Sequence, residues 1–357
     1  MADGRPRYDA GDLRRFTAEV LVRFDVPEDD ARRAADALVH ADLLGIDSHG
    51  VAHLPDHKSY VVGFRNGWVN PRPTVRVLRE TPGTALLDGD GGMGVAVAPR
   101  AMELAMEKAS AVGCGFVAVH NSRHFGAAAH YTLMAVERDM IGVAMTNAIG
   151  RHMAPTFGRE PRLATNPLSV AAPTREEPPF MMDIATTVVA AGKLEIAVRE
   201  GTSVPEGWIL DKLGRPTTNP HDFYEGGTLL PLGGKPETGS YKGYALAVMV
   251  DVLAGVLSGT GYGAMLQHRV QGIFLGAWRV DAFVDVDAFK TMLDEALRTL
   301  RNTPPAEGYD RVYTPGEREW RTFQERSRLG IPLHPKVVEE LVKLGREVGV
   351  DFPSPRE

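Results

Sequence analysis

The stretch Thr84–Val95, TALLDGDGGMGV, decides which kind of α/β fold this chain can adopt. It places G-x-G-x-x-G on Gly89, Gly91 and Gly94, after an extended run and before the helical run VAPRAMELAMEKA. In a strand–loop–helix setting, such glycines let a pyrophosphate approach the N-terminus of the helix. The stretch therefore raises the question whether the chain has a Rossmann fold.

The residues around the glycines argue against that fold. A Rossmann motif has an acidic residue about 20 positions further on, at the end of its second strand, where it holds the ribose hydroxyls. Here the second strand is GFVAVHN, which ends in His120 and Asn121 without an acid. TALLD is also preceded by another predicted strand, TVRVL, so it does not open the domain. We therefore interpret the glycines as a tight turn that requires positive φ.

Composition and charge predict an ordinary soluble globular protein. The 357 residues are 43% hydrophobic and 24% charged, and the net charge of −6 comes without a long block of either sign. This argues against nucleic acid or an anionic membrane as the main partner. No segment approaches the roughly 18 apolar residues of a spanning helix, and the N-terminus has no apolar signal region. A single cysteine, Cys114, excludes an intrachain disulfide, so we expect a cytoplasmic protein.

The predicted elements divide the chain into three segments. Residues 1–73 are mainly helical, residues 74–300 alternate strands with helices, and residues 301–357 form a helical return. We expect a mixed α/β (α+β) fold, in which helical N- and C-terminal layers pack together around a central mixed sheet. A stretch rich in glycine and proline, residues 202–240, interrupts the central segment.

A histidine-rich stretch, DSHGVAHLPDH, offers the first candidate site. His49, His53 and His57 recur every four residues, which would suit a metal ion on a helix. Pro55 would break that helix, so we expect no metal. Alternatively, the Ser48 hydroxyl orients His49, which then exchanges a proton near neutral pH. A polar helix-to-loop junction is the third possibility.

Three further stretches could bind a ligand. In NSRHFGAAAHY, small residues around Gly126 would let a ligand approach the free N–H groups of a helix N-terminus. Asp183, in PFMMDIATT, either caps the next helix or holds a catalytic imidazole. Lys242 and Gly243 open an apolar helix, which is a suitable place for a phosphate.

Taken in chain order, these motifs resemble the malate/L-lactate dehydrogenase family. The resemblance covers roughly residues 10–335 and is carried by ADLLGIDSHGV, NSRHFGAAAHY, TNPLSVAAP, DIATT with a downstream GK, GSYKGYALAVMVDVLAGVLSG and YTPGERE. This is the type 2 family of nicotinamide-dependent 2-hydroxyacid and 2-imino acid oxidoreductases. It includes ureidoglycolate, sulfolactate and piperideine-2-carboxylate enzymes.

The resemblance implies a nicotinamide-binding fold unlike the Rossmann fold, with residues 74–300 as the cofactor domain. It also implies a homodimer, NAD or NADP as cofactor, and a small carboxylate as substrate. Carried over position by position, the implied cofactor contacts are His124, Phe125, Gly126, Ala127, Ala128, Ala148, Asp183, Ile184, Ala185, Lys242, Gly243, Gly316, Glu317 and Arg318.

The same resemblance implies the reaction and its acid–base residue. Hydride would pass between nicotinamide C4 and substrate C2, with His49 as the acid–base group and Ser48 and Asp183 forming a relay around it. Some members are described with the histidine at the position of His124 as proton acceptor. We favour His49, because HFGAA is better explained as a cofactor cradle. A cyclic 2-imino acid reductase, or a member that binds nicotinamide without turnover, are the alternatives.

One position departs from the common family pattern. Many members have an arginine four residues after the catalytic histidine, where this chain has His53. Carboxylate recognition would then depend on His53, Lys58 or Arg151. Thr165 is either a substrate-side hydroxyl or a turn residue before Asn-Pro. Arg318 either holds a 2′-phosphate of NADP or is an ordinary exposed arginine.

Overall fold

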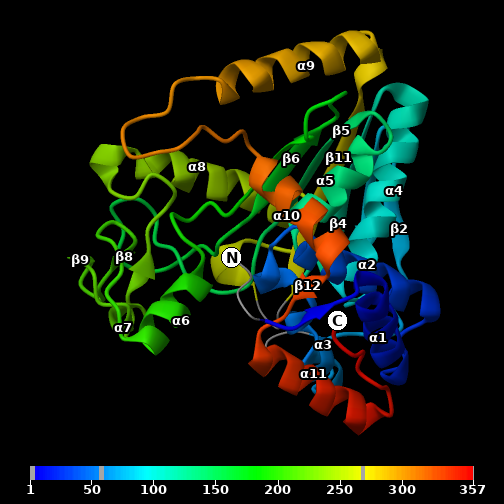
Figure 1. The fold of residues 1–357 in the computed structure, drawn as a ribbon, viewed down its shortest axis with the longest axis horizontal. Helices are drawn as coiled ribbons and strands as arrows, with labels where there is room; N and C mark the ends of the chain where they lie inside the picture. The colour runs from blue at the N-terminus through cyan, green and yellow to red at the C-terminus, as the bar shows by residue number, and fades with distance from the viewer. Residues whose placement is uncertain (1–4, 56–59, 267–269, 357) are drawn as a thin grey trace.

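A seven-stranded sheet forms the centre of the computed structural model, which describes residues 5–55, 60–266 and 270–356 (Figure 1). The strands are β2 (Arg76–Glu80), β3 (Thr84–Asp88), β4 (Cys114–Ser122), β5 (Met140–Thr146), β6 (Leu168–Ala172), β7 (Phe180–Ile184) and β11 (Gln271–Arg279). Their order across the sheet is β2-β3-β4-β11-β5-β6-β7. β3 and β4 are parallel, and the other neighbouring pairs are antiparallel. A Rossmann sheet is mostly parallel, so the predicted mixed, non-Rossmann fold is confirmed.

Helices cover both faces of this sheet and form a separate layer beside it. They are α1 (Ala10–Arg23), α2 (Glu28–Leu43), α3 (Tyr60–Arg65), α4 (Gly94–Val112), α5 (Ala128–Val136), α6 (Ala191–Glu200), α7 (His221–Tyr224), α8 (Ser240–Val250), α9 (Val286–Arg301), α10 (Glu317–Leu329) and α11 (Pro335–Val348). A π-helical turn, η4 (Asp251–Val256), continues α8. No helix within the described ranges combines the length and the apolar character needed to cross a membrane.

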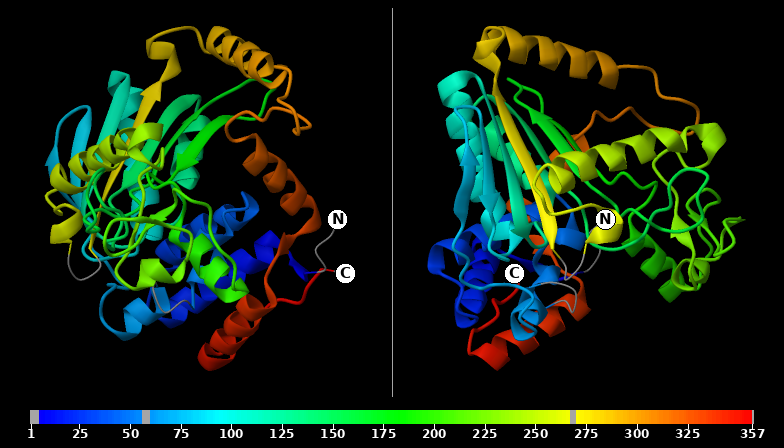
Figure 2. Two further views of the ribbon diagram at one scale, coloured as in Figure 1. Left: turned by 90° about the vertical axis from the view of Figure 1, so that its left-hand side faces the viewer. Right: turned by 180° about the vertical axis from the view of Figure 1, so that it is seen from behind.

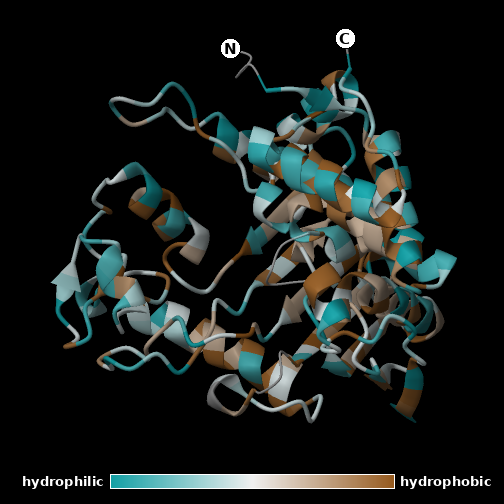
Figure 3. Ribbon diagram, turned by 90° about the horizontal axis from the view of Figure 1, so that it is seen from below, coloured by the Kyte–Doolittle hydropathy of each residue, from teal (hydrophilic) through white to brown (hydrophobic). Residues whose placement is uncertain are grey.

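The alternation of side chains along the strands divides the core into two layers. In β4, Val117 and Val119 face α4 and α5, whereas Ala118 faces α8 and η4, because successive side chains of a strand point to opposite faces. Ala254 of η4 and Phe274 of β11 belong to the second layer. The continuous apolar runs of these strands in the sequence follow from this burial on both faces. Figure 3 shows apolar residues, in brown, gathered in the interior.

The two ends of the chain share one core. β1 (Arg7–Tyr8) pairs with β12 (Ile331–Pro332), and apolar residues of α1 and α2 pack against Leu341 and Leu344 of α11. Figure 1 shows these blue and red segments together below the sheet. The C-terminal return therefore packs with the N-terminal segment as expected, while the boundaries at residues 73 and 300 stay predictions.

A small lobe occupies the stretch that the sequence marked as rich in glycine and proline. Three short antiparallel strands, β8 (Ile209–Leu210), β9 (Pro216–Thr217) and β10 (Thr228–Leu229), form a sheet of order β10-β8-β9. Leu194 of α6 packs with Ile209 and Leu229 in the core of this lobe. Figure 2 shows the lobe standing beside the main sheet.

The glycine turn of residues 89–94 is packed against the end of β4. The N–H of Gly89 donates to His120 O at 2.8 Å, and that of Gly91, whose φ is +69°, donates to Asn121 O at 2.8 Å. A Cβ on Gly94 would lie 2.3 Å from the Arg123 carbonyl oxygen. Protein atoms thus lie where a pyrophosphate would approach. Of the three glycines only Gly91 has the positive φ that the turn was expected to require, whereas Gly89 and Gly94 are packed closely against the backbone.

Two histidines, the half-buried His40 and the buried His130, join α2 to α5. His40 Nδ1 and His130 Nδ1 lie 2.9 Å apart, so one ring donates and the other accepts. Burial lowers the pKa of His40 to about 4 and that of His130 to about 3. Both rings are therefore neutral at pH 7, and a proton on the accepting Nδ1 breaks the pair.

This pair predicts acid sensitivity. Between pH 6.5 and pH 4 the unfolded chain binds more protons than the folded chain at these two positions, so the free energy of unfolding falls as pH decreases. His40→Gln, which retains hydrogen-bonding capacity but does not titrate, should lose less stability between pH 7 and pH 5 than the unchanged protein. Urea unfolding at both pH values measures the difference, with His221→Gln as the exposed control. Equal pH dependence in all three proteins would exclude the pair as its source.

Candidate active site

Three imidazole rings from two distant segments form a stack beside α2. His49 and His53 lie on the short 3₁₀ turns η1 (Asp47–His49) and η2 (Val51–His53), and His124 lies in the turn between β4 and α5. The ring centroids are 5.7 Å apart for His49 and His53, 5.5 Å for His49 and His124, and 4.8 Å for His53 and His124. The structure thus brings together three residues that the sequence singled out.

The stack does not form a metal site in the part of the chain that the structure describes. Within the described ranges, no group of three or more His, Cys, Asp or Glu side chains could hold a metal ion. The rings of His53 and His124 are within 9° of parallel, so they face each other rather than a common centre. His57, the third histidine of the spaced set, lies outside the described residues, as does Lys58.

A hydroxyl group holds two of the three rings, His49 and His124. Ser48 Oγ lies 2.9 Å from His49 Nδ1, which is the pairing that the sequence predicted. Tyr60 OH lies 2.9 Å from His124 Nδ1. A hydrogen bond at Nδ1 fixes the orientation and the tautomer of a ring, which a proton-transferring imidazole requires. Sequence reasoning missed the role of Tyr60, because α3 is separated from His124 by the whole of β3, α4 and β4.

The rings of His49 and His124 are neutral at pH 7. Burial lowers the pKa of His49 to about 4, and the neighbouring His53 lowers it further. Burial, together with His53 and His49, holds the pKa of His124 well below its usual value. A neutral imidazole is ready to accept a proton. An anion bound beside the stack would raise these pKa values, since an opposite charge favours the protonated ring.

Asp183 lies at the end of β7 and caps α5. Its Oδ2 accepts the N–H of Ala129 at 2.8 Å, and burial raises the pKa of this carboxyl to about 6. The expectation that it caps the next helix is wrong, because α6 begins after Ala190 without a side-chain cap. The expected contact with His49 is also missing: among the described residues, no hydrogen bond joins the two side chains. Of the two contacts expected around His49, the one with Ser48 is present and the one with Asp183 is not.

The backbone of the turn before α5 would allow a ligand to approach closely. Gly126 has φ +73°, and Ala127 and Ala128 are buried small residues at the start of the helix. The ring of Phe125 is 1% exposed and stacks on Tyr131 at 5.2 Å. Phe125 can therefore meet a ligand only through its backbone, whereas its side chain anchors the turn.

The ends of β5, β6 and β7 are tied to one another by backbone contacts. The N–H of Ala148 donates to Asn166 Oδ1 at 3.2 Å, and the carbonyl of Thr165 accepts the N–H of Thr186 at 2.9 Å. Ile184 and Ala185 follow Asp183 and are half-buried. Thr165 thus lies at this edge with a half-buried side chain, and its substrate role stays a prediction.

The starts of α8 and α10 supply the remaining implied residues. Lys242 is exposed, and a Cβ on Gly243 would lie 2.4 Å from Leu232 N, so this glycine allows α8 to approach the chain closely. Gly316, with φ +87°, packs in the same way on Met181 of β7. No contact joins Lys242 or Gly243 to the histidine stack in the described ranges.

The side chains of Glu317 and Arg318 differ in whether a cofactor could reach them. The Glu317 carboxylate is buried and bonds to Arg311, to Arg321 at 2.9 Å and to the N–H of Thr314 at 3.2 Å. It therefore holds the start of α10 from within. The Arg318 guanidinium is exposed and lies 4.6 Å from the centre of the Tyr313 ring. Arg151, the other candidate cation, is also exposed.

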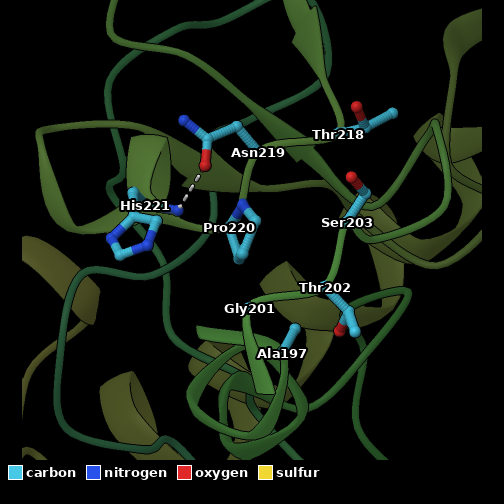
Figure 4. Close-up of a pocket in the computed structure, with 8 residues that line it drawn as sticks. All are labelled: Ala197, Gly201, Thr202, Ser203, Thr218, Asn219, Pro220 and His221. Atoms are coloured by element: carbon cyan, nitrogen blue, oxygen red, sulfur yellow. Dashed lines mark hydrogen bonds between the residues drawn. The ribbon is translucent and has the colours of Figure 1, made fainter. Parts of the chain in front are cut away.

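A surface pocket of about 260 Å³ lies in the small lobe, away from these residues (Figure 4). It is lined by polar side chains that include Thr202, Ser203, Thr218 and Asn219. The Asn219 side chain accepts the N–H of His221 at 3.2 Å. None of the residues that the sequence singled out is among its described lining, so we do not assign the reaction to it.

A serine–histidine pair with a half-buried imidazole, beside a helix N-terminus, is an arrangement that can move a proton at a bound ligand. The chain matches the model of the malate/L-lactate dehydrogenase family over residues 8–342. It therefore belongs to that family, as its motifs predicted.

Individual relatives agree with this assignment. Malate dehydrogenase of Pyrococcus abyssi is 42% identical over 350 residues, covering 96% of this chain and 95% of that protein. L-Sulfolactate dehydrogenase of Methanocaldococcus jannaschii is 36% identical over 346 residues, covering 95% and 96%. The malate dehydrogenase structure from Pyrococcus horikoshii has a TM-score of 0.90 at 39% identity and covers 98% of each chain. The Δ1-piperideine-2-carboxylate reductase structure from Pseudomonas syringae pvar. tomato has a TM-score of 0.81 at 25% identity, covering 95% and 99%.

The cap on α5 generates a stability prediction. Asp183→Ala should lower the free energy of unfolding by about 1 kcal/mol, because it removes the acceptor at a helix N-terminus. Asp183→Asn should lose less, since its amide oxygen can still accept from Ala129. Denaturant unfolding of the three proteins at pH 7 makes the comparison. If Asp183→Ala were as stable as the unchanged protein, the cap would contribute nothing measurable.

Proposed function

We propose that this chain is an NAD- or NADP-dependent dehydrogenase of small 2-hydroxy acids. Hydride would pass between C4 of the nicotinamide and C2 of a 2-hydroxy or 2-oxo carboxylate. The observation that supports this most strongly is the Ser48–His49 pair, stacked on His53 and His124 beside the N-terminus of α5. The names of the reported relatives, which are dehydrogenases of malate and sulfolactate, support the same substrate class.

The charge distribution suggests how the chain would orient the cofactor. Asp183 already places a carboxyl group at the N-terminus of α5. A second anion is unfavourable there, so the turn His124–Ala128 suits the uncharged nicotinamide end, with Ala148 and Asp183–Ala185 beside it. Lys242 at the start of α8 and Arg318 at the start of α10 are cations that suit the phosphates. When bound, the cofactor supplies or accepts the hydride.

His49 would act as the acid–base group. In the oxidising direction the neutral ring accepts the proton of the substrate hydroxyl, while Ser48 holds Nδ1. In the reducing direction the ring has to carry a proton. Because burial holds its pKa near 4, the substrate carboxylate itself would favour protonation of the stack on binding. Acid–base function would thus depend on the presence of an anionic substrate.

A cyclic 2-imino acid reductase remains the second candidate. The structural similarity to the piperideine-2-carboxylate reductase favours it, since that protein has the same fold over nearly the whole chain. In a 2-imino acid, as in a 2-oxo acid, the carbon that accepts the hydride is bonded directly to the carboxylate. Direct comparison of both substrate types is the way to separate the two.

We also propose that the chain forms a homodimer. Apolar side chains are exposed along η4 and the turn after it: Val252 is 49% exposed, Val256 56% and Leu257 57%. A second copy of the chain would cover such a row, as apolar surface of this kind marks an interaction site. Light scattering after size exclusion measures the mass in solution. The cytoplasmic location stays a prediction from the sequence.

Turnover of reduced nicotinamide tests the function and the role of His49. Purified protein is mixed with NADH or NADPH and with pyruvate, oxaloacetate, phenylpyruvate, sulfopyruvate or piperideine-2-carboxylate, and absorbance is followed. We expect oxidation with at least one oxo acid. His49→Ala should lower kcat by roughly 10²- to 10⁴-fold, the usual contribution of an acid–base residue, with cofactor affinity unchanged. Near-normal turnover of this variant would exclude His49, and activity with the imino acid alone would favour the second candidate.

His53 provides a separate prediction about the substrate carboxylate. His53→Ala should raise KM roughly ten- to hundredfold, since a hydrogen bond to a charged group contributes about 1.5–3 kcal/mol, with a smaller effect on kcat. His53→Arg should restore the affinity, because a guanidinium binds a carboxylate through two hydrogen bonds. Steady-state kinetics of the three proteins decides the point. An unchanged KM in His53→Ala would assign the carboxylate to another cation.

A further inference from the structure

The segment that carries His49 and His53 has little structure of its own. It consists of two 3₁₀ turns of three residues each, joined at Gly50. Turns this short have poor hydrogen-bond geometry and do not hold a side chain in place by themselves. Beyond the contacts of the rings themselves, their positions depend on what holds the backbone of the segment, and α2 and α10 each supply such a contact.

The contact from α2 is the carboxyl group of Asp42. Asp42 lies in the last turn of the helix and is 2% exposed. Its Oδ2 accepts the N–H of Val51 at 2.8 Å, in a hydrogen bond that is itself buried. Val51 is two residues from each of the two histidines. Removing the acceptor would leave a buried N–H unpaired at the centre of the segment, which is unfavourable.

Gly50 fits against the same carboxyl group. A Cβ on Gly50 would lie 1.9 Å from Asp42 Oδ1. The backbone of Gly50, with φ −89° and ψ −154°, is one that any residue can adopt. Glycine is therefore required by the closeness of Asp42 and not by its dihedral angles. A side chain here would displace the carboxyl group or the segment.

α10 holds the start of the segment through Arg326. Its guanidinium donates to the carbonyl oxygen of Asp42 and to the carboxylate of Asp47. Arg326 thus fixes the entry to η1, whereas Asp42 fixes the middle. With both contacts in place, the Ser48–His49 pair is held between two points.

Asp42 fulfils this role as a neutral group. Burial raises the pKa of its carboxyl to about 8, and Asp47 raises it as well, whereas the Val51 N–H and Arg326 lower it. Asp42 therefore carries a proton at pH 7 and accepts a hydrogen bond without placing a charge near His49. An asparagine has the same shape and offers the same acceptor.

We propose that Asp42 is a positioning residue for the reaction, which places His49 through the backbone of Gly50 and Val51. The inference rests on the proposed function, in which His49 transfers the proton. Asp42 would then position the segment as well as belong to helix α2. Gly50, next to His49, would be required by its contact with Asp42 and not by backbone flexibility.

Five variants test the inference. Asp42→Ala and Gly50→Ala should each lower kcat about ten- to hundredfold, the loss expected for a misplacement on the order of 1 Å. Affinity for NADH or NADPH, measured by tryptophan fluorescence, should stay within about twofold. Asp42→Asn should retain kcat, because the acceptor for Val51 is kept. The double variant should lose no more than either single one, since both changes break one anchor. Asp30→Ala is the matched control.

Asp30 is also a buried acid of α2, but it pairs with Arg100 at 2.6 Å, at the other end of the helix. Its loss should lower the melting temperature and leave kcat unchanged. Normal kcat in folded Gly50→Ala would overturn the inference even if Asp42→Ala failed to fold. The inference would also be overturned if Asp42→Asn lowered kcat as much as Asp42→Ala does, or if Asp30→Ala lowered kcat by the same factor. Normal turnover of His49→Ala would instead exclude His49 as the acid–base group, and no turnover by the unchanged protein would refute the proposed function.

Discussion

The placement of β11 between β4 and β5 determines most of this structure. Residues 271–279 pair on one side with β4 and on the other with β5, although those two strands are close neighbours in the sequence. The separation leaves α4 and α5 on one face and α8 with η4 on the other. It also directs the turn after β4, with His124, toward the N-terminal helices. His124 meets His49 and His53 there, so the histidine stack joins the end of β4 to the turns that follow α2.

The sequence predicts the elements of this sheet better than their order. Long apolar runs such as those of β4, β5 and β11 are recognisable because both faces of the strands are buried. Their pairing depends on contacts across more than a hundred residues, which local periodicity does not contain. The strands of the small lobe were missed for another reason: two residues, as in β8, are too few to show an alternation.

The same distinction holds for the candidate site. The Ser48–His49 pair was predictable, because the two residues are neighbours in the chain. The cap that Asp183 forms was not predictable, because helix caps are sought among residues next to the helix, and this one caps a helix that begins 55 residues earlier. For the G-x-G-x-x-G pattern, in contrast, neighbouring residues in the sequence were enough to predict its use. Its glycines are explained by atoms of β4 that lie against them, so the flanking strand decided between two uses of one motif.

The pairing of β1 with β12 has a consequence for biosynthesis. α1 and α2 bury their apolar faces against α11, so the core that they share is incomplete until α11 has left the ribosome. Domains usually fold in the order of their synthesis. Here the first helices emerge early and have to wait for a partner more than 300 residues downstream. Such distant contacts slow folding, and the exposed helices are natural clients for chaperones during that interval.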